Sequence, residues 1–175
     1  MESVNNQRAT ENFDIYLTRR MFMLLPQSEY YHDPFQNIDH RFTVGGGLGY
    51  FLIDKPKTEW LISGGPAYQS IRFSTVEAGE SQDRSTVAIV VQSSFDIELT
   101  KRTDLEIGYT ATAANEDSGG LTQHGTISLV IELTRTLDLD ISFIWDRIGN
   151  PQATSSGVVP KNSDFRLNLS FGVKF

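Results

Sequence analysis

The residues of this chain most able to do chemistry are seven carboxylates that lie within a few positions of short turns. Each occupies a polar position in a segment where apolar and polar residues alternate: Asp96, Glu98, Asp104, Glu106, Glu132, Asp138 and Asp140. If the polar faces of these segments line a barrel lumen, the carboxylates form a ring at one end, and such a ring attracts cations. We favour a simpler interpretation. Ion pairs with Arg166, Lys174 or basic turn residues fill a narrow lumen, because buried charges must be paired.

Other catalytic and binding motifs are weaker. Paired carboxylates are also found in glycosidases, but these occupy ordinary alternating positions with no sign of a cleft. His32, Asp39 and His40 offer zinc ligands, yet scattered surface histidines, His124 included, are the favoured interpretation, because metal sites need more ligands and supporting contacts. The glycine tract 45–49 continues into an apolar segment, whereas a phosphate-binding loop needs a helix there. With no nucleophile elbow or Ser-His-Asp order, the sequence predicts no enzymatic activity, metal or cofactor.

Composition excludes several classes of partner and chemistry. The chain has 175 residues and no cysteine, which removes disulfide frameworks, cysteine-ligated metals and thiol catalysis. Its net charge of −7 argues against nucleic acid, which requires a basic patch. No run approaches the roughly 18 apolar residues of a membrane helix, and the mean hydropathy is −0.27. A membrane β-barrel has the same hydropathy, because half of each strand faces a polar interior. The first eight residues contain no apolar stretch, so we expect any signal peptide to be absent from this chain or to lie upstream of it.

The elements that must position the carboxylates are long alternating segments. In the last of them, residues 162–175, apolar side chains occupy every second position up to Phe175. Strict period-two alternation predicts a β-strand, and a tilted strand of about 9 to 11 residues crosses a bilayer. The same pattern predicts nine strands and no helix, over residues 11–18, 21–31, 41–54, 60–69, 86–99, 104–113, 124–133, 137–146 and 162–175. Glycines within the third strand mark a bend or a close approach.

The connections between these segments alternate in length. Tight turns at 19–20, 54–58, 101–102 and 135–136 alternate with longer loops beginning near His32, Ser74, Asn115 and Gly149. This asymmetry is typical of an antiparallel meander β-barrel of the outer-membrane type, whose tight turns face the periplasm. Bacterial barrels have even strand numbers, and an unclosed one leaves backbone groups unpaired in lipid. We therefore expect residues 1–175 to form one domain that is the C-terminal part of a larger barrel, with further strands before Met1 and unpaired or parallel edges at its first and last strands.

Several segments carry a resemblance to a known family. They are residues 30–41 (YYHDPFQNIDHR), the glycine tract that follows, residues 64–68 (GGPAY) and the closing residues 146–175. These resemble the YdiY-like family of salt-induced outer-membrane proteins, a domain of unknown function. The resemblance implies an outer-membrane barrel with a link to salt or osmotic response, and it brings no catalytic or binding residues. The terminal strand, with Leu169, Phe171, Val173 and Phe175, resembles the C-terminal strand by which outer-membrane barrels reach the barrel-assembly machinery.

Three functional hypotheses remain. The leading one is a non-enzymatic protein of the bacterial outer membrane with membrane lipid as its partner. The second is a small cation-preferring pore that uses the acidic ring. The third is a soluble β-barrel that binds an apolar ligand, and it requires the reverse arrangement, with Ile107, Ile131 and Phe171 pointing into the core.

Overall fold

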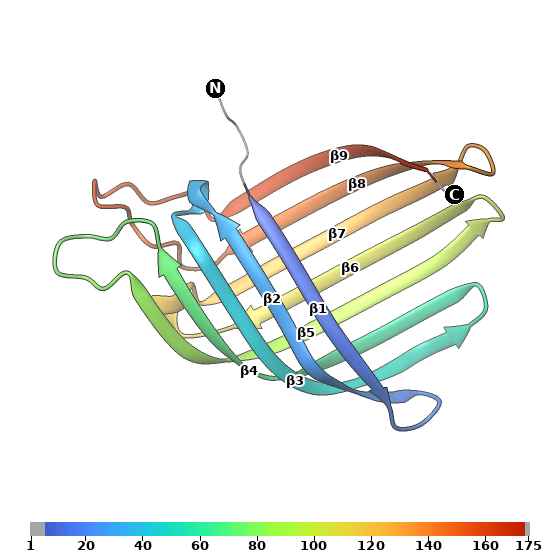
Figure 1. Ribbon diagram of the computed structural model, residues 1–175, viewed down its shortest axis with the longest axis horizontal. Coiled ribbons are helices and arrows are strands. Elements are labelled where there is room, and N and C mark those ends of the chain that lie inside the picture. The colour runs from blue at the N-terminus through green and yellow to red at the C-terminus, as the bar shows by residue number, and fades with distance from the viewer. Residues whose placement is uncertain (1–5, 174–175) are drawn as a thin grey trace.

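The computed structural model describes residues 6–173, which form a single nine-stranded antiparallel sheet (Figure 1). The strands are β1 (Gln7–Tyr16), β2 (Met21–Asp33), β3 (Ile38–Lys55), β4 (Thr58–Phe73), β5 (Asp83–Thr100), β6 (Thr103–Ala113), β7 (Leu121–Glu132), β8 (Leu137–Ile148) and β9 (Ser163–Val173). Each pairs with the next in the chain, so the predicted antiparallel meander is confirmed. The prediction of no helix misses two single turns of 3₁₀ helix, η1 (Pro34–Gln36) and η2 (Glu116–Ser118). No helix in the described range is long and apolar enough to cross a membrane.

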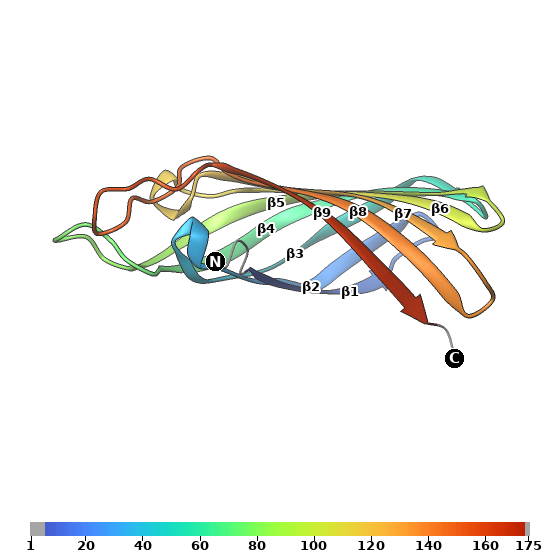
Figure 2. The same ribbon diagram turned by 90° about the horizontal axis from the view of Figure 1, so that it is seen from above.

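The sheet curls into an open barrel. In Figure 1, β1 and β2 cross in front of β5 to β7, and Figure 2 shows β1 and β2 on the opposite side of the hollow from β5 and β6. Over residues 6–173, β1 pairs only with β2 and β9 only with β8, so no backbone ladder joins the first strand to the last. These unpaired edges are one of the two arrangements expected from the strand count.

The two faces of the sheet differ in polarity. Ile107 on β6 and Phe171 on β9 are 37% and 68% exposed on the outer face, whereas Gln92, Thr110 and Thr126 line the hollow. The same alternation runs through the neighbouring strands, because directly paired residues lie on the same face. The arrangement required by the soluble apolar-binding barrel is therefore wrong.

A line of glycine and proline crosses β2, β3 and β4 where the sheet bends. The register shifts between Leu24 and Gln27 on β2, opposite the glycine tract of β3. A Cβ atom on Gly47 would lie 2.2 Å from the carbonyl oxygen of Gly64 on β4, so only glycine permits this approach. The tract lies inside β3, which rules out the phosphate-loop interpretation and fits the expected close approach.

The space left by these glycines is filled from β2. A Cβ atom on Gly49 would lie 2.1 Å from the ring of Phe22, which crosses the bare inner face of β3 and packs 5.3 Å from the ring of Phe51. Leu24 and Leu61 complete this apolar cluster at the tight-turn end of the hollow. A second cluster, around Tyr31 and Ile71, lies at the long-loop end. The interior is therefore polar between two apolar clusters.

Candidate functional site

The predicted acidic residues share the inner face near the tight turns. Asp96 pairs in register with Glu106, Glu98 with Asp104, and Glu132 with Asp138, while Asp140 lies two residues further along β8. Two carboxylates that sequence reasoning missed extend the set, because Asp54 is opposite Glu59, and Glu59 is opposite Asp96. The result is a row of four carboxylates, Asp54, Glu59, Asp96 and Glu106, on four adjacent strands. We call it the carboxylate row.

Few cations balance these charges. Lys57 Nζ lies 2.7 Å from Glu98 Oε1, and Arg19 Nε lies 3.2 Å from Asp54 Oδ2. Ser142 donates to Asp140 at 2.6 Å. Within residues 6–173, no basic side chain comes within 4.0 Å of a carboxylate oxygen of Asp96, Asp104 or Glu106. Among the described residues, ion pairs therefore do not neutralise these three carboxylates, and Lys174, one of the expected partners, lies outside the described residues. The three carboxylates line a groove of about 370 Å³ beside Lys55 and Lys57.

Arg166 pairs at the other end of the hollow. Its guanidinium donates to Asp146 Oδ2, and Asp146 Oδ1 accepts from Arg8 at 2.7 Å and from Nδ1 of His124 at 2.8 Å. One carboxylate on β8 thus binds cationic or N–H groups from β1, β7 and β9. His124 lies on β7 and faces the hollow, on the polar side of the strand predicted over residues 124–133.

The same network continues onto β2 and β3. Glu29 accepts from Arg8 at 2.5 Å and from Arg41 at 3.0 Å. The register places Tyr31 directly between Arg8 and Arg41, and both guanidinium groups lie over its ring, 4.5 and 4.8 Å from the centroid. We call the set Arg8, Glu29, Tyr31, Arg41, His124, Asp146 and Arg166 the loop-end network.

The sequence analysis did not predict the loop-end network, although its charged residues are visible in the sequence. Arg8 and Arg41 lie at or beyond the predicted starts of their strands, and Glu29 lies in a segment where consecutive apolar residues obscure the alternation. The other histidines have different surroundings. His32 Nδ1 contacts the carbonyl oxygen of Asp39, and His40 lies 3.2 Å from the Asp39 carboxylate. In the part of the chain that the structure describes, no three His, Cys, Asp or Glu side chains are grouped to hold a metal ion.

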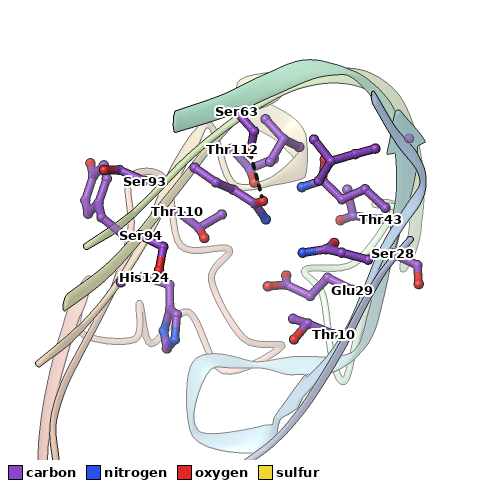
Figure 3. Close-up of a pocket in the computed structure, with 18 of the residues that line it drawn as sticks. Thr10, Ser28, Glu29, Thr43, Ser63, Ser93, Ser94, Thr110, Thr112 and His124 are labelled. Carbon is purple, nitrogen blue, oxygen red and sulfur yellow. Dashed lines mark hydrogen bonds between the residues drawn. The ribbon is translucent and has the colours of Figure 1, made fainter. Parts of the chain in front are cut away.

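A polar chamber of about 350 Å³ separates the loop-end network from the carboxylate row (Figure 3). Its walls come from β1 to β4 on one side and β5 to β7 on the other, and most of its labelled lining residues are serine or threonine. These hydroxyl groups donate and accept hydrogen bonds alike, and His124, whose Nδ1 contacts Asp146, lies on the same lining.

The predicted assembly residues lie on the open edge strand. Leu169, Phe171 and Val173 are all exposed on the outer face of β9, whereas Phe175 lies outside the described residues.

Comparison with known proteins identifies the family. No curated protein matches the chain. A family of unknown function matches it from residue 1 to residue 175, and this match does not extend to the narrower YdiY-like, salt-induced description. The chain belongs to the family described as "Protein of unknown function, DUF481".

Proposed function

We propose that this protein is a non-enzymatic β-barrel of the bacterial outer membrane. The observation that carries the proposal is the apolar outer face, which continues across all nine strands opposite a polar hollow. Its exposed residues include Ile15, Leu48, Ile62, Ile89, Ile107, Ile127, Phe143 and Leu167. A soluble monomer rarely exposes such a contiguous apolar surface, whereas a membrane barrel requires one.

The ends of the strands support the same location. Trp60 lies near the tight turns, and Tyr30, Phe42 and Tyr68 lie towards the long loops, all of them exposed on the outer face. Aromatic girdles at both interfaces are a feature of membrane barrels. Leu105 to Ala113 of β6 extends about 26 Å at 3.3 Å per residue, close to the height of an apolar membrane band.

Two polar side chains on the outer face have partners, whereas Trp145 Nε1 on the same face has none among the described residues. Trp60 Nε1 donates to Ser93 Oγ at 3.0 Å, and the Tyr109 hydroxyl donates to Gln123 at 2.9 Å. Such pairs suit a lipid environment, where each unsatisfied polar group costs several kcal/mol. The apolar residues of β9 on the outer face fit contact with the barrel-assembly machinery. The resemblance to the YdiY-like family supports a role in salt or osmotic response.

Cell fractionation tests the proposal. The protein expressed in its own host is expected in the outer-membrane fraction and to resist extraction by carbonate. After extraction in detergent, unheated and heated samples are expected to migrate differently on a gel. A protein that remains folded and monomeric in plain buffer contradicts the proposal.

A second function, a cation-preferring pore, is favoured by the carboxylate row. Four carboxylates in register on one wall concentrate cations, and Glu106 has no basic partner among the described residues. Planar-bilayer recordings are expected to show cation preference that falls in the variant Asp96→Asn/Glu106→Gln. The matched control is Glu116→Gln, outside the hollow on η2. Absence of conductance, or a preference that this double variant leaves unchanged, removes the pore and leaves the barrel proposal standing.

A further inference from the structure

The chamber of about 350 Å³ between the loop-end network and the carboxylate row has the size of a small-ligand site. Hydroxyl groups line it from both sides, including Thr10, Thr43, Ser63, Thr110, Thr112 and Thr126. In Figure 3, Thr43 and Thr10 lie on one wall, and Thr110 and Thr112 lie on the facing wall. The strand order and the curl of the sheet give this arrangement, because β4 and β5 separate β3 from β6.

Three polar side chains on the chamber wall are mostly buried. Thr43, Thr112 and Gln27 are only 6%, 8% and 9% exposed. None of them forms a side-chain hydrogen bond with the protein between residues 6 and 173. None of their polar atoms is fully enclosed, so these atoms reach the chamber from β2, β3 and β6, where they are available to a bound molecule.

The charges around the chamber determine which class of ligand it can bind. At the loop end, Arg8 is already bound by Glu29 and Asp146, so it offers no free cation to an anionic ligand. The buried middle carries hydroxyl and amide groups, which donate and accept hydrogen bonds alike. Among the described lining residues, Asp14, on the exposed strand β1, is the one carboxylate besides Glu29. The buried part of the chamber is therefore matched to a neutral ligand rich in hydroxyl groups.

An apolar surface completes the site. Phe22, Leu24 and Leu61 line the chamber on the side of the tight turns. A sugar ring presents hydroxyl groups at its edge and C–H groups on its face, and binding sites commonly combine apolar walls with a few convergent polar groups. We propose that the chamber binds a small neutral sugar, held by Thr43 and Thr112 from opposite walls and packed against Phe22.

The test uses the full chain folded in lauryldimethylamine oxide, a detergent without a sugar headgroup. Isothermal titration with glucose and with maltose is expected to give saturable binding for at least one of them, and gluconate, the anionic analogue, is expected to bind at least about tenfold more weakly. Thr43→Val and Thr112→Val each remove one hydroxyl and keep the branched shape. Each is expected to weaken binding by up to about tenfold, the effect of one lost hydrogen bond. The matched control is Thr136→Val, in an exposed tight turn outside the chamber.

Each result of these titrations either supports or contradicts the sugar site. Saturable sugar binding that Thr43→Val or Thr112→Val weakens, with Thr136→Val unchanged, supports the site. The site is overturned if neither sugar gives saturable heat at concentrations up to about 100 mM. It is also overturned if gluconate binds as tightly as glucose. The third contradicting result is an affinity for the sugar that is the same in Thr43→Val, in Thr112→Val and in the unchanged protein. Heat-modifiable gel migration shows that each variant is folded. Because binding is measured in detergent, its failure is distinct from a failure of the membrane proposal, which rests on cell fractionation.

Discussion

Arg8, at the start of β1, donates to the carboxylate of Asp146 on β8 at 2.7 Å, although 138 positions separate them in the sequence. Arg166 of β9 donates to the other oxygen of the same carboxylate. Since β1 and β9 share no ladder in the described part of the chain, these side chains link the two ends of the open sheet. The Asp146 side chain is only 8% exposed, so the link is shielded from solvent.

Asp146→Asn is expected to destabilise the folded protein by about 3 to 5 kcal/mol, because it leaves two arginines and His124 around a neutral amide. Arg8→Met is expected to cost less, since Asp146 keeps Arg166 and His124, and Glu29 keeps Arg41. Urea unfolding in detergent measures both. Lys57→Met serves as control, because its exposed pair with Glu98 contributes about 1 kcal/mol or less. Equal effects for Asp146→Asn and Lys57→Met contradict a structural role for the link.

Ile107→Arg is expected to lower the stability of the folded protein in a bilayer by about 2 to 4 kcal/mol if the residue lies at the bilayer midplane, and by less near an interface. Thr110→Arg, on the same strand but facing the hollow, is expected to be milder. Folding into phosphatidylcholine vesicles, followed by gel migration with and without heating, compares the two. The reverse order of effects means that the lipid-facing side has been assigned wrongly.

Gly49→Ala is expected to destabilise the protein by about 1 to 3 kcal/mol, because the added methyl group overlaps the Phe22 ring. Combining it with Phe22→Leu is expected to show a favourable coupling of about 0.5 kcal/mol or more, since the smaller side chain makes room. Gly47→Ala is the comparison. There the clash is with the backbone carbonyl of Gly64, which no change at Phe22 relieves. Additive effects of Gly49→Ala and Phe22→Leu argue against the contact.

Glu106→Gln is expected to stabilise the protein by about 0.2 to 1 kcal/mol at low salt, because Glu106 lies directly opposite Asp96 and like charges in this position are unfavourable. The gain is expected to shrink as salt screens the repulsion. Glu98→Gln is the comparison, because it also relieves a like-charge pair, with Asp104, but loses the ion pair with Lys57, so its gain is expected to be smaller. Denaturant unfolding at two salt concentrations checks both, and a Glu106→Gln effect that does not change with salt rules out the proposed repulsion.

The sequence by itself determined the strands and their faces. Alternation from Val87 to Leu99 and from Leu105 to Ala113 placed most large apolar side chains outside and the carboxylates inside, with Val90 an inward exception, because successive side chains of a strand point to opposite faces whatever the strand packs against. The tight turns predicted that strands consecutive in the chain are neighbours in the sheet. Strand starts were less well predicted, and β1 begins at Gln7 instead of Glu11, because ladder hydrogen bonds extend a strand beyond its alternating core.

The tertiary structure decided which charges meet. Alternation places Arg166 on the inner face but does not give its height along the barrel, and the register of β8 with β9 brings it to Asp146 and away from the carboxylates near the tight turns. The meeting of Arg8 with Asp146 depends on the curl of the whole sheet, to which the close approach of β3 and β4 at Gly47 belongs. Contacts between strands that are distant in the sheet follow from curvature, and curvature is a property of all the strands together.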